Sequence, residues 1–249
     1  MKKVAIITGA SSGVGKEFAL QIDKLSCVDE IWITARREAR LQELSKSLLT
    51  ETRIFSGDIN SENLMQEFSE TLASKEYEVK YLVNSAGLGI PDKFINIPLE
   101  SQLNMIDVNV RSLTWLCQMI IPYMNKGSEI INIASVAAFM PQHEFAVYAA
   151  TKAYVMNFSR ALNSELKSRD IKVIAVCPNP MKTEFFKEIP QGLKKLGFED
   201  VDKVVSKALR RSAKGKELSI QSFMANLIRF ISKILPHRFI LFFERKFMS

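Results

Sequence analysis

The chain has 249 residues, of which 47% are apolar and 24% charged. This is typical of a globular protein and long enough for one large-cored domain, but hardly for two. The formal net charge of +7 is concentrated at one end: residues 187–249 carry fourteen Lys or Arg against six acids, whereas the preceding 186 residues carry twenty against twenty-one. A nearly neutral body without a recognition motif excludes a general nucleic-acid-binding protein.

Three widely spaced cysteines, Cys27, Cys117 and Cys177, lie in apolar neighbourhoods. Their odd number and their lack of metal-ligand spacing argue against a disulfide framework or a metal site and favour a reducing, cytoplasmic location. The first residues, MKKVAIITG, imitate the start of a signal peptide, but the apolar run before Gly9 is shorter than the ~7–15 residues of such a core. This run is therefore predicted to be a buried strand.

The first predicted unit is a strand over 3–7, a glycine turn (GASSGVG) and a helix that runs to Leu25. In this context Gly9 makes a tight turn, Gly13 leaves room for a pyrophosphate and Gly15 lets the helix pack closely on the sheet. The free N–H groups at the start of the helix then bind phosphates. The alternative is a plain glycine-rich connection.

The second predicted strand, EIWIT, is followed by Ala35, Arg36 and Arg37. A fold that uses NAD typically has an acid here to bind the ribose 2′-hydroxyl, and such an acid would repel a 2′-phosphate. A guanidinium binds phosphate and stacks on adenine, so the sequence predicts a preference for NADP(H). Arg36 is the first candidate and Arg37 the second, unless either is a solvated helix-start residue; Ser11 and Ser12 offer further donors.

Strands and helices keep alternating along the rest of the body, as in a parallel sheet covered by helices on both faces. Asp58, at a strand end, either accepts from the adenine amino group or opens the turn into the next helix. Asn84, Ala86 and Gly87 end the fourth strand, where a nucleotide would pass. Further helices are predicted over 38–49, 61–74, 101–125 and 146–169, and further strands over 53–56, 80–87, 128–135, 172–178 and 217–221.

Four polar residues in the second half of the chain are candidates for chemistry. Asn109 lies inside a predicted helix between two valines, which suggests that it is partly buried and has a functional role. Ser135 ends a strand, and Tyr148 and Lys152 lie one helical turn apart on the same face. A cation beside a phenol lowers the phenol pKa from ~10 toward neutrality, which makes a proton donor. Tyr154 lies on another face; the alternative for the pair is a surface helix with one Tyr and one Lys.

Over residues 3–183 the chain resembles the short-chain dehydrogenase/reductase family. The resemblance rests on a set of motifs that occur in the family's order: TGASSGVG, Asp58, NSAG at 84–87, Asn109, Ser135, Tyr148 and Lys152. The glycine spacing is that of its compact members. The resemblance implies that Tyr148 is the general acid and base, that Lys152 lowers its pKa and holds the nicotinamide ribose, that Ser135 positions the substrate oxygen, and that Asn109 holds a water in a proton relay.

The resemblance also implies the residues that contact the cofactor. One departs from the family pattern: a glycine usually follows Pro178, and here it is Asn179, which tolerates a left-handed backbone better than most residues. The cofactor-binding candidates are Gly9, Ser11, Ser12, Gly13, Val14, Gly15, Arg36, Arg37, Asp58, Ile59, Asn84, Ala86, Gly87, Tyr148, Lys152, Pro178, Asn179 and Thr183.

We therefore expect one doubly wound α/β domain over 1–249, with seven strands in the order 3-2-1-4-5-6-7. The expected function is an NADP(H)-dependent oxidoreductase that interconverts a carbonyl and a secondary alcohol; NAD(H) is the alternative cofactor. An apolar substrate is favoured by the Phe- and Leu-rich substrate flap that opens 184–216. The alternatives are a non-catalytic nucleotide sensor or scaffold on the same fold and, less favoured by glycine spacing, an epimerase or dehydratase.

The segment 222–249 is basic and amphipathic, with apolar residues from Phe223 to Ile234 on one helical face. Its apolar runs are too short to span a bilayer. Three interpretations stay open: it lies on an anionic membrane surface, packs on a second subunit or covers its own substrate cleft. We also expect a homodimer or homotetramer, because the helices over 101–125 and 146–169 are long enough to pair across a two-fold axis.

Overall fold

The computed structural model contains one sheet of seven parallel strands in the order β3-β2-β1-β4-β5-β6-β7. It describes residues 1–249 except 75–76, 186–196, 237, 240 and 243–249. Both the order and the parallel direction confirm the prediction. The strands are β1 (Lys2–Thr8), β2 (Glu30–Ala35), β3 (Glu51–Ser56), β4 (Tyr77–Asn84), β5 (Glu129–Ile133), β6 (Lys172–Val176) and β7 (Leu218–Ser219).

The central strand β1 shows why the sequence has continuous apolar runs where strands occur. Successive side chains of a strand point to opposite faces of the sheet, and here both faces are covered. Val4 and Ile6 belong to the core on one face, whereas Ala5 and Ile7 belong to the core on the other. A strand buried in this way has no polar face, which is why its sequence shows no alternation.

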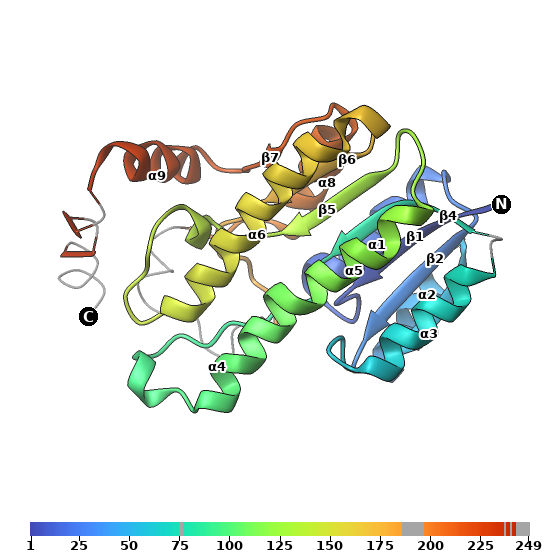
Figure 1. Ribbon diagram of the computed structural model, residues 1–249, viewed down its shortest axis with the longest axis horizontal. Helices are drawn as coiled ribbons and strands as arrows, with labels where there is room; N and C mark the ends of the chain where they lie inside the picture. Colours follow the sequence, from blue (N-terminus) through green and yellow to red (C-terminus); the bar gives the residue numbers. More distant parts are fainter. Residues whose placement is uncertain (75–76, 186–196, 237, 240, 243–249) are drawn as a thin grey trace.

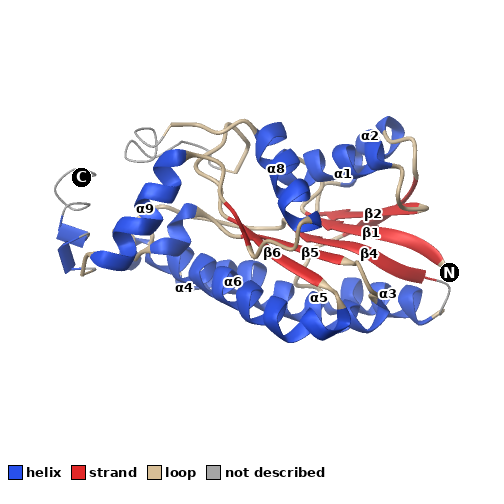
Figure 2. Ribbon diagram, turned by 90° about the horizontal axis from the view of Figure 1, so that it is seen from above, coloured by secondary structure: helices blue, strands red, loops and turns tan. Residues whose placement is uncertain are grey.

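The helices form two layers, one on each face of the sheet (Figure 2). Helices α3, α4, α5 and α6 lie on one side, and α1, α2 and α8 lie on the other. The helices are α1 (Gly13–Leu25), α2 (Glu38–Ser47), α3 (Glu62–Ala73), α4 (Leu99–Ile106), α5 (Ser112–Ile120), α6 (Ala146–Glu165), α8 (Val201–Ala213) and α9 (Phe223–Ile234), with short 3₁₀ turns at 94–96, 121–123, 136–139 and 166–169.

The helix predicted over 101–125 is not continuous, and this is the main correction to the predicted elements. A π-helical turn, Asp107–Arg111, separates α4 from α5, and a 3₁₀ turn ends the segment at Tyr123. The π turn coincides with Asn109, whose side chain bonds to neighbouring elements rather than to solvent. Smaller differences are that α6 becomes 3₁₀ after Glu165 and that β7 has two residues instead of five.

The last described helix, α9, extends beyond the end of the sheet, far from the N-terminus (Figures 1 and 2). Ser222 caps it by accepting a hydrogen bond from the backbone N–H of Ala225 at 3.0 Å. Most of its apolar side chains are exposed, with Phe223 reaching 82%. Within the described part of the chain, no helix combines the length and apolarity needed to cross a bilayer.

Candidate active site

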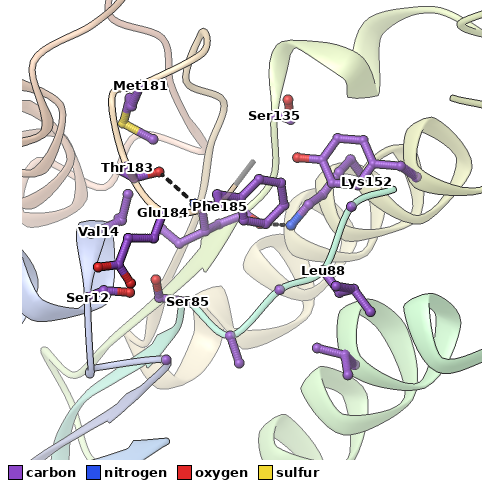
Figure 3. A pocket seen from close by; sticks show the side chains of 18 of the residues that line it. Ser12, Val14, Ser85, Leu88, Ser135, Lys152, Met181, Thr183, Glu184 and Phe185 are labelled. Atoms are coloured by element: carbon purple, nitrogen blue, oxygen red, sulfur yellow. Dashed lines mark hydrogen bonds between the residues drawn. The ribbon is translucent and has the colours of Figure 1, made fainter. Parts of the chain in front are cut away.

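One large cavity of about 1080 Å³ opens where the carboxyl ends of the strands meet. Parallel α/β sheets bind ligands at this edge, at the point where the strand order reverses. The cavity is lined by the glycine turn after β1, by Ala35, Arg36 and Arg37 at the end of β2, and by residues after β4, β5 and β6. Figure 3 shows that its side chains come from segments far apart in the sequence, such as Ser12, Ser85, Lys152 and Thr183.

The glycine turn is built for close approach of the backbone. Gly9 has a φ of 66°, and a Cβ placed on it would lie 2.9 Å from the backbone nitrogen of Ala86. A Cβ on Gly15 would collide with the carbonyl of Gly9, so only glycine fits there. The turn is tied to the end of β4, because the Thr8 hydroxyl accepts hydrogen bonds from the N–H groups of Ser85 and Ala86 at 3.0 and 2.9 Å.

The start of α1 offers donors to an anion. Ser12 occupies the N-cap position but makes no side-chain cap, so the first N–H groups of the helix keep no partner within it. Ser12, Gly13 and Val14 all line the cavity. A glycine cradle that a Cβ would fill, beside uncapped N–H groups, fits the pyrophosphate of a dinucleotide. Gly15 lies behind this lining and has the packing role expected of it.

A second anion-binding set lies at the end of β2. Arg37 donates to the hydroxyls of Ser11 and Ser12 at 3.0 and 2.8 Å and to the carboxylate of Glu184 at 2.6 Å. Arg40, one turn further along α2, also donates to Glu184, at 2.6 and 2.7 Å. The two arginines hold the pKa of the Glu184 carboxyl down at about 2. Two guanidiniums around one anion, one of them also bonded to the hydroxyls of Ser11 and Ser12, fit a ribose 2′-phosphate.

Sequence reasoning favoured Arg36 within this set and missed Arg40. Arg36 does line the cavity, but the contacts to the serines are made by Arg37. Arg40 could have been found from its spacing of three residues from Arg37, because residues three apart on a helix lie on the same face. Glu184 gave no signal at all, since its partners are 147 and 144 residues away.

Of the cofactor-binding candidates after β3 and β4, some line the cavity and one does not. Asp58 and Ile59 line the cavity, and the Asp58 carboxylate accepts from the N–H of Asn60 at 2.9 Å, as a residue that opens a turn does. Ala86 and Gly87 also line the cavity. Asn84 instead lies buried beneath it, where its amide donates to Asn132 at 2.8 Å, so its contribution is to the strand framework.

Tyr148 and Lys152 lie together at the other end of the cavity, and both are almost fully buried, at 7% and 4% exposure. The Lys152 ammonium lies 5.6 Å from the centroid of the Tyr148 ring and donates to the carbonyl of Ile133 at 2.8 Å. Burial raises the pKa of Tyr148 to about 12 and lowers that of Lys152 to about 8. The first shift is opposite to the expected lowering, because loss of hydration outweighs every nearby stabilising contact.

Ser135 completes this end of the site. It follows β5 and caps a 3₁₀ turn, where its hydroxyl accepts from the N–H of Ala137 at 3.2 Å. A hydrogen bond between Ser135 and Tyr148 partly offsets the rise in the Tyr148 pKa. The ring of Phe145 stacks on Tyr148 with centroids 4.2 Å apart. A buried phenol with a raised pKa stays protonated at neutral pH, but it gives up its proton less readily than a phenol whose pKa lies near the working pH.

Asn109 binds to three groups from the π turn. Its amide oxygen accepts from the N–H of Leu88 at 2.9 Å, and its amide nitrogen donates to the carbonyl of Leu88 at 2.8 Å and to the hydroxyl of Thr151 at 3.0 Å. Asn109 therefore joins the loop after β4 to α6 one residue before Lys152. Such π turns are frequent at functional sites. The role of Asn109 in holding a water stays a prediction.

Pro178, Asn179 and Thr183 all line the cavity. Asn179 does not adopt the left-handed conformation that was expected of it. It is held instead by its N–H, which donates to Glu199 at 3.0 Å, and by its side-chain amide, which donates to the Ser222 hydroxyl at 2.8 Å. Thr183 lies against Gly13, within 3.3 Å of where a Cβ on that glycine would be. Tyr154, in contrast, bonds to Thr114 away from the cavity.

Comparison with known proteins identifies relatives of the whole fold. A family model described as short chain dehydrogenase matches residues 3–194. An uncharacterized oxidoreductase of Staphylococcus epidermidis is 33% identical over 184 residues, which cover 73% of this chain and 79% of that protein. The very-long-chain 3-oxoacyl-CoA reductase of Rattus norvegicus is 30% identical over 242 residues, which cover 93% of this chain and 75% of that protein.

Solved structures agree on the architecture. A short-chain dehydrogenase from Sphingobium yanoikuyae in complex with NADPH superposes with a TM-score of 0.78 at 24% identity, covering 95% of this chain and 97% of that one. Some solved chains of this fold are complexes with NADPH or NADP, and others are complexes with NAD or NADH.

Proposed function

The chain belongs to the short-chain dehydrogenase/reductase family of oxidoreductases, and we propose that it is an NADP(H)-dependent reductase of an apolar carbonyl, with the alcohol oxidation as the reverse reaction. The observation that carries this proposal is that one cavity joins two sets of residues. Tyr148, Lys152 and Ser135 lie at one end, and Arg37 lies at the other, where it shares the Glu184 carboxylate with Arg40.

The protein's own residues would orient the substrate and move one proton. The Tyr148 phenol donates its proton to the carbonyl oxygen during reduction and takes it back during oxidation. The Ser135 hydroxyl bonds to the same oxygen and holds it near the phenol. Lys152 provides a buried ammonium that binds the ribose hydroxyls of the cofactor and favours developing negative charge on the phenol. The bound nicotinamide would supply or accept the hydride.

The preference for NADP(H) rests on the residues after β2. No acid stands at that position. Arg37 and Arg40 converge on the Glu184 carboxylate, and Arg37 also donates to Ser11 and Ser12. We expect NADPH to bind more tightly than NADH in a direct titration of cofactor fluorescence. Arg37→Ala should weaken NADPH binding about tenfold or more and leave NADH binding within about twofold. An equal loss for both cofactors, or tighter binding of NADH by the wild-type protein, would refute the preference.

An apolar substrate is supported by the side chains around the catalytic end of the cavity. Leu88, Ile90, Val136 and Phe145 line it near Tyr148, and such walls favour apolar ligands. The rat relative is named a very-long-chain 3-oxoacyl-CoA reductase. The test is a panel of ketones and 3-oxoacyl thioesters of increasing chain length, followed by NADPH absorbance. Turnover that does not increase with apolar chain length would contradict the substrate class, and no turnover of any member would favour the nucleotide sensor.

The exposed apolar face of α9 is proposed to contact an anionic membrane surface. Exposed Phe223, Phe230 and Ile234 and the basic residues Arg229 and Lys233 belong to the same amphipathic helix, which is the pattern of an interfacial helix. No described residue of α9 lines the cavity, but its cap Ser222 accepts from the cavity residue Asn179, so covering of its own cleft stays the alternative. Flotation with vesicles rich in anionic lipid, compared with a Phe223→Ser, Phe230→Ser double variant, tests this proposal. Equal flotation of both proteins, or none, would contradict it.

A homodimer or homotetramer that pairs through α4, α5 and α6, and a cytoplasmic location, also stay predictions. Size-exclusion chromatography with light scattering measures the first. The odd number and wide spacing of the cysteines support the second.

A further inference from the structure

Two consecutive residues, Glu184 and Phe185, reach opposite ends of the cofactor cavity. Both line it, and Figure 3 shows their side chains diverging, Glu184 toward Ser12 and Phe185 toward Lys152. They follow Thr183, which lies against Gly13 of the glycine turn. One short piece of backbone therefore places a carboxylate at one functional end and an aromatic ring at the other.

The carboxylate of Glu184 has the bonding pattern of a bound anion. It accepts three hydrogen bonds of 2.6 to 2.7 Å from Arg37 and Arg40. Arg37 at the same time donates to Ser11 and Ser12. A phosphate monoester bound here would use the same guanidinium donors. Both ligands cannot take these donors together, because two anions at hydrogen-bond distance from one guanidinium pair would repel each other.

The ring of Phe185 lies in front of the catalytic pair. Its centroid is 5.9 Å from that of Tyr148. Its edge lies against the glycines after β4, where a Cβ on Gly89 would be 3.0 Å from the ring and one on Gly87 would be 3.7 Å away. The same point beside Gly87 is 3.5 Å from the Lys152 nitrogen. A planar group that approaches Tyr148 and Lys152 from the cavity must share this space with the ring.

We propose that Glu184 and Phe185 are an internal occupant of the cofactor site, in which the carboxylate takes the place of the 2′-phosphate and the phenyl ring takes space that the reactive ring of the cofactor needs. The proposal rests on the proposed function. Binding of NADP(H) then exchanges one anion for another on Arg37 and Arg40. Glu184 therefore lowers the affinity for any ligand with a phosphate at this point, and Phe185 acts only on ligands that reach Tyr148.

Ligands that correspond to only half of the cofactor test the effects of Glu184 and Phe185 separately. Adenosine 2′,5′-bisphosphate carries the anion for Arg37 and Arg40 but has no second ring for the catalytic end; adenosine 5′-diphosphate lacks the 2′-phosphate. By calorimetric titration, Glu184→Gln should bind the bisphosphate about fivefold more tightly than wild type, as expected for removing a competing exposed ion pair, with little change for the diphosphate. The Phe185→Ala variant should bind the bisphosphate with the same affinity as the wild-type protein and should bind NADPH more tightly.

Glu38→Gln is the matched control, because Glu38 is an acid on the same helix as Arg40 that bonds to Gln42 at 3.2 Å instead. It removes the same charge from the neighbourhood without freeing either arginine, so the affinity for the bisphosphate should stay within about twofold. An equal gain from Glu38→Gln and Glu184→Gln would mean a general charge effect and overturn the proposal.

The outcomes also separate this proposal from the proposed function. If the wild-type protein binds the bisphosphate and Arg37→Ala abolishes that binding, but Glu184→Gln changes nothing, the NADP(H) site stands and the internal occupant is wrong. If the wild-type protein and Glu184→Gln both fail to bind the bisphosphate, while NADH binds, the cofactor preference itself is wrong.

Discussion

Lys152 donates a 2.8 Å hydrogen bond from its ammonium to the carbonyl oxygen of Ile133, the last residue of β5. The bond joins the helix that carries Tyr148 to the strand that leads into Ser135, so the three catalytic candidates share one framework. It also holds a cation in a place that is 4% exposed. Burial lowers the pKa of this ammonium from 10.5 to about 8.

Lys152→Met is expected to stabilise the fold at neutral pH while removing activity. A lysine with a folded-state pKa below its unfolded value opposes folding wherever both states are protonated, here below about pH 8. The effect fades as pH rises from about 8 to 10.5, because the folded state has already lost its proton. The shift corresponds to about 3 kcal/mol in the free energy of unfolding. Urea denaturation at about pH 7 and pH 10.5 measures it.

The exposed Lys167 provides the control. Lys167→Met should leave the dependence of stability on pH as it is in the wild-type protein. If the advantage of Lys152→Met over wild type is the same at both pH values, the buried ammonium does not oppose folding in the way its pKa indicates.

Tyr148→Phe should lower kcat/KM for carbonyl reduction by about 10²–10⁴-fold, because it removes the proton donor and little else. Steady-state assays give the rate, and titration of cofactor fluorescence should find NADPH binding within about twofold of wild type. Tyr154→Phe, at the neighbouring tyrosine whose hydroxyl is 3.0 Å from that of Thr114, should keep full activity. Comparable losses from both variants would remove Tyr148 from the catalytic role.

The pH dependence of reduction follows from the protonated phenol. Burial raises the pKa of Tyr148 to about 12, so loss of the phenol proton should not limit reduction until the pH approaches that value. The ammonium of Lys152 is lost earlier, through about pH 8. We therefore expect NADPH affinity to fall as pH rises through about 8, measured by titration between about pH 6 and pH 10. A flat affinity over this range would contradict the role of the charged Lys152.

Asn109→Ala is expected to destabilise the protein by about 2 kcal/mol. The change removes the partners of both backbone groups of Leu88 and one partner of Thr151, and groups left unpaired in a partly buried place cost about this much. Asn96→Ala, at an exposed asparagine bonded to Asp92, should stay within about 0.5 kcal/mol. Equal chemical stability of the two variants would show that the amide of Asn109 does not hold the π turn.

Gly15→Ala should destabilise the fold by about 3 kcal/mol or more, because the added methyl group collides with the backbone of Gly9. Gly57→Ala is the comparison, since a Cβ there meets Leu64 at an ordinary 3.6 Å. It should change stability by less than about 1 kcal/mol. Thermal denaturation of the two variants distinguishes a position with no room for a Cβ from one where a Cβ fits.

The features that the sequence predicted correctly depend on short-range patterns. The buried strands follow from continuous apolar runs, and the pairing of Tyr148 with Lys152 follows from a spacing of one helical turn. The order of the strands followed from the same alternation together with the family resemblance. All of these are set within a few residues or by a rule for parallel sheets.

The features that were missed depend on contacts between distant segments. The salt bridges of Glu184 join residues more than 140 positions apart, and no local spacing reports them. The raised pKa of Tyr148 depends on how deeply α6 is buried and on the direction of the Lys152 ammonium, which bonds to Ile133. A single extra residue in a helical turn leaves the apolar periodicity around Asn109 almost unchanged, so the π turn had no clear signature.

That extra residue fixes the phase of the two helices on either side of it. Adding one residue to a turn rotates all later side chains by about 100° relative to an uninterrupted α-helix. As a result, Met105 of α4 packs with Tyr148, whereas Leu113 and Leu116 of α5 pack in the core beneath the sheet. A one-residue deletion between Ile106 and Ser112 would give a more regular helix. It would also rotate the apolar face of either α4 or α5 away from its packing partners and expose it to solvent. The irregular turn thus keeps Tyr148, the proposed proton donor, and the sheet core in register with each other.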